Sequence, residues 1–268
     1  MTASPPRVLI VAGSDSSGGA GIQADIKTVT MLGGYAMTAV TAITAQNTLG
    51  VHAARVLDPE LVAAQIDSCI ADVGVDAVKI GMLGSAAIAD IVADRLAATG
   101  VPIVFDPVMV ATSGSVLADE ATVAAFERLM RLTLVVTPNL PELATLAGAK
   151  IHSDTDMLTA ARTLGARHGC AVLAKGGHGP SDQLTDLLVT ADGKVTSFTN
   201  RRIETRHTHG TGCTLASALA TGLARGRSLP QATQDGIAFV RAAIAAAPGF
   251  GSGAGPLGHH GVRSAVNS

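Results

Sequence analysis

The chain has 268 residues, a formal net charge of −2 at pH 7, and 47% hydrophobic but only 2% aromatic residues. Its length fits one large α/β domain or two small ones, and an apolar fraction supplied by Ala, Val, Leu and Ile favours helices packed closely on a parallel sheet. The charge balance gives no basic field that would attract a nucleic acid, and no apolar run reaches the length of a membrane span, so we expect neither partner.

Short apolar runs rich in β-branched residues recur along the chain and are typical of buried strands. They cover residues 8–11, 37–43, 77–80, 101–105, 134–136 and 171–173. Helical spacing between them is clearest over 61–73, 86–97 and 121–132, the first of these after the capping pair Asp58-Pro59. Alternating strands and helices predict a mainly parallel sheet with helices on both faces, whose ligands gather at the carboxyl ends of the strands.

Toward the C-terminus the alternation is interrupted. Residues 184–189 and 194–198, joined by Ala191-Asp192-Gly193, predict a hairpin with a tight turn, which we interpret as an antiparallel edge of the sheet. No repeat or linker divides the chain. We therefore expect one domain over residues 1–268, with 1–6 and about 249–268 forming loop or tail.

The three cysteines, Cys69, Cys170 and Cys213, form no CxxC pair. An odd number of widely spaced thiols is poor material for a disulfide framework. We therefore expect a reducing, cytoplasmic environment, with Cys69 and Cys170 as small core residues.

The first predicted strand runs into a loop, residues 13–21, that is rich in glycine and hydroxyl side chains. Gly19, Gly21 and Ala24 match the dinucleotide fingerprint G-x-G-x-x-A, which raises a Rossmann oxidoreductase as an alternative. The match fails because residues 26–57 contain no acidic side chain to hold the ribose hydroxyls. The loop is therefore interpreted as a small-ligand loop, with a flexible turn between strand and helix as the alternative.

Polar side chains also follow later predicted strands. Asp106 ends one of them, and Lys175 ends another, where its ammonium could contact phosphate or be solvated. Thr137-Pro138-Asn139-Leu140-Pro141-Glu142 places Asn139 at a helix N-cap and Glu142 at the N3 position. That pair could be a cap alone, or could offer oxygen ligands to Mg²⁺ with Asp106 at the same sheet edge. No G-x-x-x-x-G-K-[ST] sequence occurs, so any nucleotide is held without a P-loop.

The run His209-Gly210-Thr211-Gly212-Cys213-Thr214 opens an apolar stretch, residues 215–223, that predicts a helix. Glycine allows close backbone approach, and the unpaired N–H groups and dipole of a helix start attract anions such as phosphate. A thiol there is expected to ionise more easily than free cysteine, as a base or nucleophile would, although many such turns are only caps.

The histidines carry no predicted metal site. His207 with His209, and the adjacent His259 and His260, lack a cysteine or a third well-spaced ligand that would complete a zinc site. We expect these histidines to be solvated or to stabilise turns.

Six segments together closely resemble one family, the hydroxymethylpyrimidine/phosphomethylpyrimidine kinases of thiamine biosynthesis. They are residues 12–25, Ala45-Gln46-Asn47-Thr48, Lys79-Ile80-Gly81-Met82-Leu83, Thr137-Pro138-Asn139-Leu140-Pro141-Glu142, Lys175-Gly176-Gly177-His178 and His209-Gly210-Thr211-Gly212-Cys213-Thr214. The resemblance covers about residues 7–260. It implies a ribokinase-like fold, which is a three-layer α/β/α domain usually found as a homodimer.

The resemblance also implies an activity, in which ATP and Mg²⁺ serve two successive phosphorylations. The first acts on the hydroxymethyl group of 4-amino-5-hydroxymethyl-2-methylpyrimidine, and the second converts the monophosphate to the diphosphate. Gln46 would hydrogen-bond the aminopyrimidine edge, because an amide offers both a donor and an acceptor. Other residues would shape the substrate site. They are Asp25 and the main chain around Gly13 and Ala20, which would orient the ring, and Met82 and Val108, which would form apolar walls.

At the phosphate end, the resemblance implies that Lys175 neutralises phosphate oxygens and that Asn139 and Glu142 position the nucleotide and Mg²⁺, with Asp106 nearby. The amides of Gly210, Thr211 and Gly212 would stabilise the transferring phosphoryl group. Cys213 would accept the proton of the hydroxyl in the first step, at the position where many ribokinase-like sugar kinases carry an aspartate.

Two other functions stay open on these residues. A pyridoxal or pyridoxine kinase on the same scaffold would act on a similarly substituted ring that bears a hydroxymethyl group. A non-catalytic pyrimidine-binding protein would have no need of Lys175, Glu142 and Cys213 together. We expect the adenine contacts around residues 195–208 and 237–246, and the sequence leaves open whether a monovalent cation binds.

Overall fold

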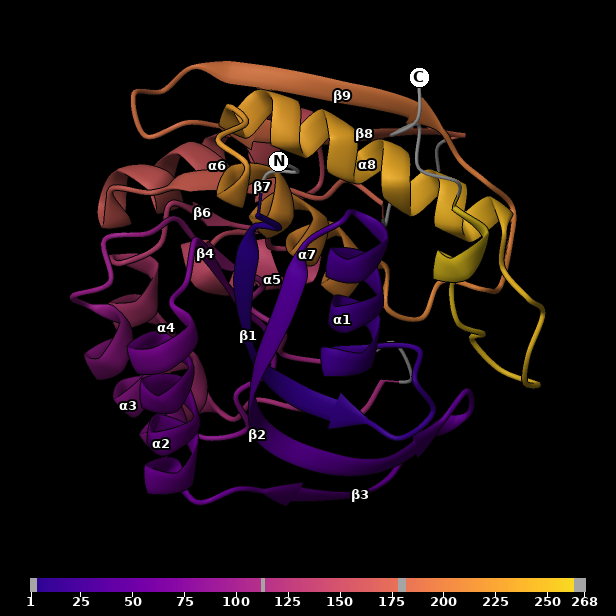
Figure 1. Cartoon of the computed structure of the whole chain (residues 1–268). Coiled ribbons are helices and arrows are strands. Elements are labelled where there is room, and N and C mark those ends of the chain that lie inside the picture. Colours follow the sequence, from indigo (N-terminus) through magenta and orange to yellow (C-terminus); the bar gives the residue numbers. More distant parts are fainter. Residues whose placement is uncertain (1–3, 112–113, 178–181, 263–268) are drawn as a thin grey trace.

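This computed structural model describes residues 4–111, 114–177 and 182–262. The strands in these residues form one mixed sheet. The nine strands found in these residues have the order β3-β2-β1-β4-β5-β6-β7-β8-β9 (Figure 1). Their bounds are β1 Arg7–Asp15, β2 Tyr35–Asn47, β3 Gly50–Val56, β4 Ala77–Ile80, β5 Ile103–Phe105, β6 Val135–Val136, β7 Ala171–Ala174, β8 Gln183–Val189 and β9 Val195–Arg201. Neighbouring strands in the run β2-β1-β4-β5-β6-β7 are parallel. At the two edges, β3 is antiparallel to β2, β8 is antiparallel to β7, and β9 is antiparallel to β8.

Helices cover both faces of this sheet. They are α1 Gly21–Met31, α2 Pro59–Ser68, α3 Ala86–Leu96, α4 Glu120–Met130, α5 Leu140–Ala147, α6 Asp154–His168, α7 Thr211–Ala224 and α8 Leu229–Ala245, with a π-helical turn over Cys69–Val73 and a 3-10 turn over His259–Gly261. Several starts follow from side-chain caps, because Asp58, Ser85 and Asp119 each accept a hydrogen bond from an N–H of the first turn. Helices α1, α7 and α8 lie on one face and α2, α3 and α4 on the other (Figure 1).

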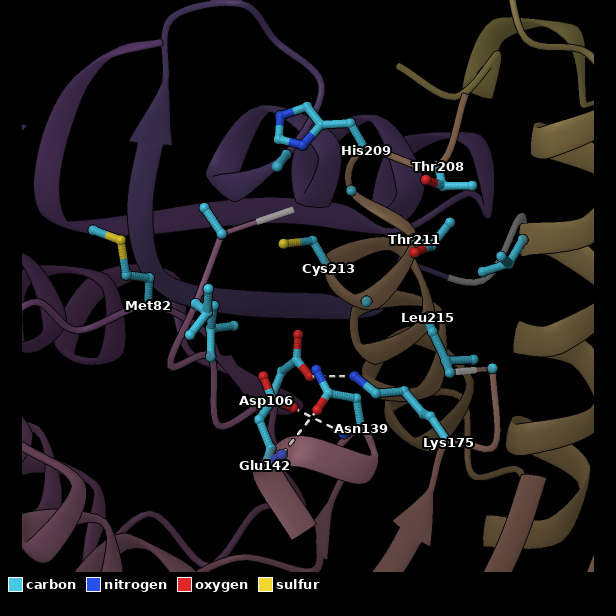
Figure 2. Close-up of a pocket in the computed structure, with 18 of the residues that line it drawn as sticks. Met82, Asp106, Asn139, Glu142, Lys175, Thr208, His209, Thr211, Cys213 and Leu215 are labelled. Carbon is cyan, nitrogen blue, oxygen red and sulfur yellow. Dashed lines mark hydrogen bonds and ion pairs between the residues drawn. The ribbon is translucent and has the colours of Figure 1, made fainter. Parts of the chain in front are cut away.

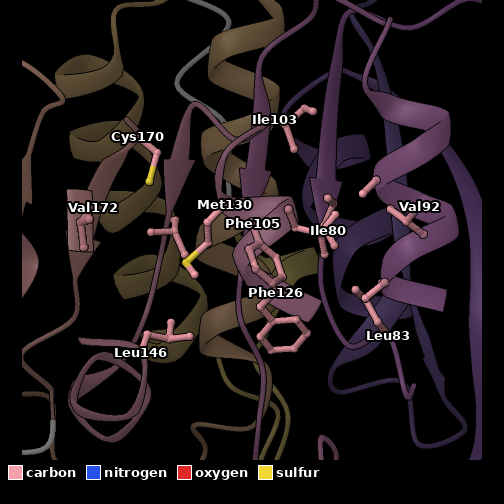
Figure 3. Close-up of a cluster of buried hydrophobic side chains, with 14 of the residues drawn as sticks. Ile80, Leu83, Val92, Ile103, Phe105, Phe126, Met130, Leu146, Cys170 and Val172 are labelled. Atoms are coloured by element: carbon pink, nitrogen blue, oxygen red, sulfur yellow. The ribbon is translucent and has the colours of Figure 1, made fainter. Parts of the chain in front are cut away.

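The sheet divides the interior into two apolar layers, and the inner strand β1 contributes to both. Leu9 and Val11 belong to a cluster with the α2 to α6 side, whereas Val8 and Ile10 belong to a cluster with α1, α7 and α8. In the first cluster the rings of Phe105 and Phe126 meet edge to face with centroids 5.0 Å apart (Figure 3). This alternation of side chains along one strand is what produces a three-layer α/β/α arrangement.

The expected architecture is confirmed. The predicted strand over 77–80 is β4, the predicted hairpin is β8–β9, and the predicted helices over 86–97 and 121–132 are α3 and α4 within one or two residues. A second antiparallel edge strand, β3, was not predicted. Its side chains are half-buried or exposed on both faces, so it carries no alternating apolar pattern.

The chain after α8 is packed loop over most of its described length. A main-chain hydrogen bond of 3.1 Å runs from the His209 N–H to the carbonyl of Gly255. A Cβ on Gly251 or Gly253 would meet Thr48 at 2.3 or 2.1 Å, so this glycine-rich segment lies directly on the end of β2. Residues 263–268 lie outside the described residues.

Candidate active site

A cavity of about 810 Å³ opens at the carboxyl ends of the parallel strands. This is the place where open α/β sheets bind ligands, and the volume lies within the usual range for small-molecule sites. Its lining comes from the segments after β1, β4, β5, β6 and β7, from the start of α7 and from one face of α8. The predicted loop, strand-end residues and helix start therefore share one cavity.

The loop after β1 is organised by Asp15, which is 3% exposed. Its Oδ1 accepts hydrogen bonds from the Ser17 N–H and hydroxyl at 2.8 and 2.7 Å, and its Oδ2 accepts from the Gly19 and Ala20 N–H groups at 3.0 and 2.8 Å. Burial alone would raise the pKa of Asp15, but hydrogen bonds from His209, Ser17 and Ala20 hold it at about 2. The carboxylate is thus charged at neutral pH and fixes the loop.

His209 connects this loop to the far turn of the cavity. Its Nε2 lies 2.9 Å from Asp15 Oδ2 and 3.0 Å from the side-chain nitrogen of Gln46. His209 is 6% exposed and His259 is 2% exposed, so neither is solvated, and His209 takes the other expected role by stabilising the turn before α7. Local sequence patterns do not indicate this burial, because the partners of His209 lie far away along the chain.

A second polar group forms where β5 and β7 end. Asp106 Oδ1 accepts hydrogen bonds from Lys175 Nζ and from the Thr137 hydroxyl, each at 2.9 Å. A Cβ on Gly212 would lie 3.2 Å from Asp106 Oδ2 and 3.3 Å from Lys175 Nζ. The start of α7 therefore meets this ion pair at a position where only glycine fits without displacement.

Asn139 and Glu142 form the predicted capping box at the start of α5. Asn139 Oδ1 accepts from the Glu142 N–H at 2.9 Å, and Glu142 Oε2 accepts from the Asn139 N–H at 2.8 Å. Burial raises the pKa of Glu142 to about 7; the charge of Lys175 opposes this rise and that of Asp106 adds to it. Figure 2 shows Asp106, Asn139, Glu142 and Lys175 gathered on one side of the cavity.

The turn before α7 lies against the first loop. Gly210 has φ +88°, and a Cβ there would lie 1.9 Å from the Gly19 carbonyl oxygen, so only glycine fits. The first hydrogen bond inside α7 runs from the Thr214 N–H to the Gly210 carbonyl. The amides of Gly212 and Cys213 precede that bond and line the cavity at the positive end of the helix dipole.

The Cys213 thiol points into the cavity, toward the space that Met82 also faces (Figure 2). Burial raises its pKa to about 11, against the lowering effect of the Lys79 charge and with the further raising effect of Asp25 and Asp106. The expectation that this thiol ionises more easily than free cysteine is therefore wrong. The loss of hydration of the thiolate outweighs the stabilisation that the N-terminus of α7 was expected to provide.

The remaining predicted substrate residues divide into two groups. Gly13, Ala20, Met82 and Val108 line the cavity, and a Cβ on Gly13 would lie 2.7 Å from the Met82 methyl. Asp25 does not line it: it is fully buried behind the wall, where it pairs with Lys79. Asp25 therefore does not directly contact a substrate ring bound in this cavity.

The expected adenine region lies at the other end of the same cavity. Residues from 195–208 and from 237–246 both contribute to its lining there, namely Asn200, Arg202, Ile203, Thr208, Ile237, Val240, Arg241 and Ile244. These side chains combine apolar surface with polar groups.

Fold and site together are those of a small-molecule kinase, with a glycine-rich helix start and a lysine in the wall of one cavity. The chain belongs to the phosphomethylpyrimidine kinase family, whose model matches residues 15–258. A hydroxymethylpyrimidine/phosphomethylpyrimidine kinase of Streptomyces coelicolor is 48% identical over 95% of this chain and 94% of that protein. In Geobacter sulfurreducens a thiamine biosynthesis bifunctional protein is 47% identical over 94% of this chain, which spans 52% of that protein.

A solved structure supports the same fold. The pyridoxal kinase of Staphylococcus aureus in complex with AMP-PCP and pyridoxal has a TM-score of 0.89 and 32% identity, covering 98% of this chain and 96% of that one. The ribokinase-like fold is thus confirmed. Structural likeness to a pyridoxal kinase also means that shape alone does not choose between the two ring substrates.

In the described residues, no helix is long and apolar enough to cross a membrane.

Proposed function

We propose that this protein transfers the γ-phosphoryl group of ATP first to 4-amino-5-hydroxymethyl-2-methylpyrimidine and then to its monophosphate, in thiamine diphosphate biosynthesis. One observation carries the proposal. In a chain of this family, the Asp15–His209–Gln46 group and the Asp106–Lys175 pair line a single cavity, with Gly212 and Cys213 between them. A ring site and an anion site thus meet across the start of α7.

At the ring end, Gln46 provides the amide that pairs with an aminopyrimidine edge. Its side-chain nitrogen lies 3.0 Å from His209 Nε2, the ring nitrogen that also lies 2.9 Å from Asp15 Oδ2, so the amide sits beside a histidine that the first loop fixes in place. Met82 and Val108 supply apolar walls, and the main chain at Gly13 and Ala20 closes the site.

At the phosphate end, Lys175 and the amides of Gly212 and Cys213 stabilise the transferring phosphoryl group, whereas the Thr211 N–H donates to the Thr208 carbonyl. Fixed donors suit this task because phosphoryl transfer depends mainly on positioning and on charge stabilisation. The Asp106 carboxylate holds Lys175 in place at 2.9 Å. Gly210 lets the turn approach closely because its φ of +88° costs glycine little.

The donor set fits Mg²⁺. Asp106 and Glu142 are buried carboxylates on one side of the cavity, and the pKa of Glu142, raised to about 7 mainly by burial and in part by Asp106, marks a place where added positive charge would be favourable. Mg²⁺ needs only one or two carboxylates when phosphates and water complete its shell. Asp106, Glu142 and the Asn139 amide would hold it, and it would neutralise charge on the ATP phosphates.

Cys213 is the proposed proton acceptor in the first step. A thiolate with a pKa of about 11 is a strong base, although only a small fraction of the thiol is ionised at neutral pH. The second step uses a phosphate acceptor that is already ionised, so it needs no such base.

Further proposals concern assembly and environment. A homodimer is supported by apolar side chains left exposed along the β2–β3 edge, among them Tyr35, Ile43, Leu49 and Val56. Three free cysteines are in keeping with a cytoplasmic setting.

Substrate-dependent ADP release by the purified protein tests the proposed function. Hydroxymethylpyrimidine, its monophosphate and pyridoxal are supplied separately with Mg²⁺-ATP, and the first two should be turned over with the higher kcat/KM. Faster turnover of pyridoxal would favour the pyridoxal kinase alternative. Absence of ADP release with all three would favour a non-catalytic binding protein and reject both kinase functions.

A further inference from the structure

A buried ion pair lies directly behind the cavity wall. Lys79 Nζ is 2.7 Å from Asp25 Oδ2, and both side chains are 0% exposed. The Ser217 hydroxyl donates to Asp25 Oδ1 at 2.8 Å. Burying two charges costs several kcal/mol per ion, and an apolar pair of similar volume is often equally stable or more so. The stability of the fold therefore does not by itself explain why Lys79 and Asp25 are buried together.

The Lys79–Asp25 pair is linked to Cys213 by helices α1 and α7, which each carry two of the residues involved at a spacing of four. On α7, Ser217 follows Cys213 by four residues, so both side chains share one face of the helix. On α1, Asp25 follows Gly21 by four residues in the same way. The backbone N–H of Gly21 favours the thiolate form of Cys213 and so lowers its pKa. One turn further along both helices, the Ser217 hydroxyl donates a hydrogen bond to Asp25. Figure 1 shows α1 and α7 on the same face of the sheet, and the two helices are in contact.

Along α7, Cys213 therefore lies one helical turn, a rise of about 5 Å, from Ser217, the residue that bonds Asp25. Lys79 is part of the cavity wall next to Cys213, although its side chain is fully buried in that wall. The other charged groups that face the thiol are Asp106, at the end of β5, and Lys175, at the end of β7. The charge of Lys79 favours the thiolate, whereas the charges of Asp25 and Asp106 disfavour it.

We propose that Lys79 and Asp25 are positioning residues that set the proton affinity of Cys213, the ammonium stabilising the thiolate and the carboxylate limiting that stabilisation. This inference rests on the proposed function. In the first step the thiolate takes the proton of the hydroxymethyl oxygen, which forms a bond to the γ-phosphorus while the bond to the bridging oxygen breaks and ADP leaves. The Cys213 proton is then lost to solvent.

A balance of the two charges serves this reaction. An ammonium acting alone would make the thiolate a permanent counter-ion and a weak base, whereas a carboxylate acting alone would leave the thiol un-ionised. The pair lets a strong base form transiently. Because Lys79 and Asp25 come from β4 and α1, the sheet and the first helix fix this balance before substrate binds.

The test is the pH dependence of Cys213 alkylation by iodoacetamide in the resting full-length protein, followed by mass spectrometry of the peptide that contains Cys213. Asp25→Asn should move the midpoint to lower pH, with reaction about tenfold faster at pH 8 for each unit of that shift. The double variant Lys79→Met/Asp25→Asn removes both charges without leaving one unpaired, and it should move the midpoint to higher pH.

Asp76→Asn is the matched control, because it removes an equally short ion pair, with Arg7, at a partly exposed site away from the cavity. It should leave the alkylation midpoint unchanged. Midpoints equal to wild type in Asp25→Asn and in the double variant would overturn the inference and leave the pair a structural role. If Asp25→Asn does not fold, the double variant alone decides by the same criterion. Since alkylation needs no substrate, failure of the proposed kinase activity would be recognised separately.

Discussion

Asp15 and His209 are 194 positions apart in sequence, yet Asp15 Oδ2 and His209 Nε2 lie 2.9 Å apart in the interior. The contact joins the loop after β1 to the turn before α7, and a Cβ on Gly19 would meet the His209 ring at 2.4 Å. The proposed ring site and the proposed anion site are therefore coupled through this contact. Movement of either segment would change the position of Gln46, which also contacts His209.

Replacing Asp15 tests this connection. Asp15→Asn puts an NH₂ group where a carboxylate now accepts four hydrogen bonds from Ser17, Gly19 and Ala20. We expect the free energy of unfolding to fall by about 1–3 kcal/mol, because a buried donor would face other donors. The KM for the pyrimidine should rise more than the KM for ATP. Chemical denaturation and initial rates measure these effects, with the exposed Asp67→Asn as control. Unchanged stability and KM would show that the loop does not depend on Asp15.

Replacing Cys213 separates the two phosphorylations. Cys213→Ala should lower kcat for the alcohol by roughly 10²–10⁴-fold, the usual contribution of a general base, and should lower kcat for the monophosphate much less. In the wild type, the rate with the alcohol should rise between pH 7 and 9, because the thiolate fraction grows about tenfold per pH unit below a pKa of about 11. The variant should lack this rise. Equal losses for both acceptors would contradict the role of Cys213 as base.

Gly212→Ala probes the closeness of α7 to the phosphate end. The added methyl group would lie 3.2 Å from Asp106 Oδ2 and 3.3 Å from Lys175 Nζ, so the helix start or the ion pair must shift. A shift of this kind should lower kcat/KM for both acceptors by roughly 10²-fold. Gly50→Ala is the control, since a Cβ there meets nothing within 4 Å. Full activity of Gly212→Ala would mean that the phosphoryl group does not approach this turn.

Buried His259 should make stability depend on pH. Burial lowers its pKa to about 4, with a further lowering from Lys27, so the folded protein keeps it neutral while the unfolded chain binds a proton near pH 6.5. Stability is then complete above pH 6.5 and is lost as the pH falls toward 4, by up to about 3 kcal/mol. Urea unfolding of wild type and His259→Gln at several pH values measures this. A parallel pH dependence in both proteins would exclude His259 as its source.

Local patterns predicted much of the fold and part of the site. β4 and the capping box at Asn139 followed from apolar runs and from residue spacing, since both depend on neighbours along the chain. The properties of His209, Asp25 and Cys213 did not, because each is set by partners from other elements. Asp25 was predicted to help orient the ring, yet it is enclosed by Lys79 and Ser217. The thiol was predicted to ionise readily, yet burial dominates its pKa.

The most direct measurement is the amount of ADP formed per pyrimidine when wild-type protein exhausts a limiting amount of 4-amino-5-hydroxymethyl-2-methylpyrimidine in excess Mg²⁺-ATP. Product chromatography over the same time course identifies the phosphorylated species. A single cavity that serves both steps predicts transient monophosphate, final diphosphate and two ADP for each pyrimidine consumed. No ADP, or one ADP with the monophosphate as the final product, would contradict it.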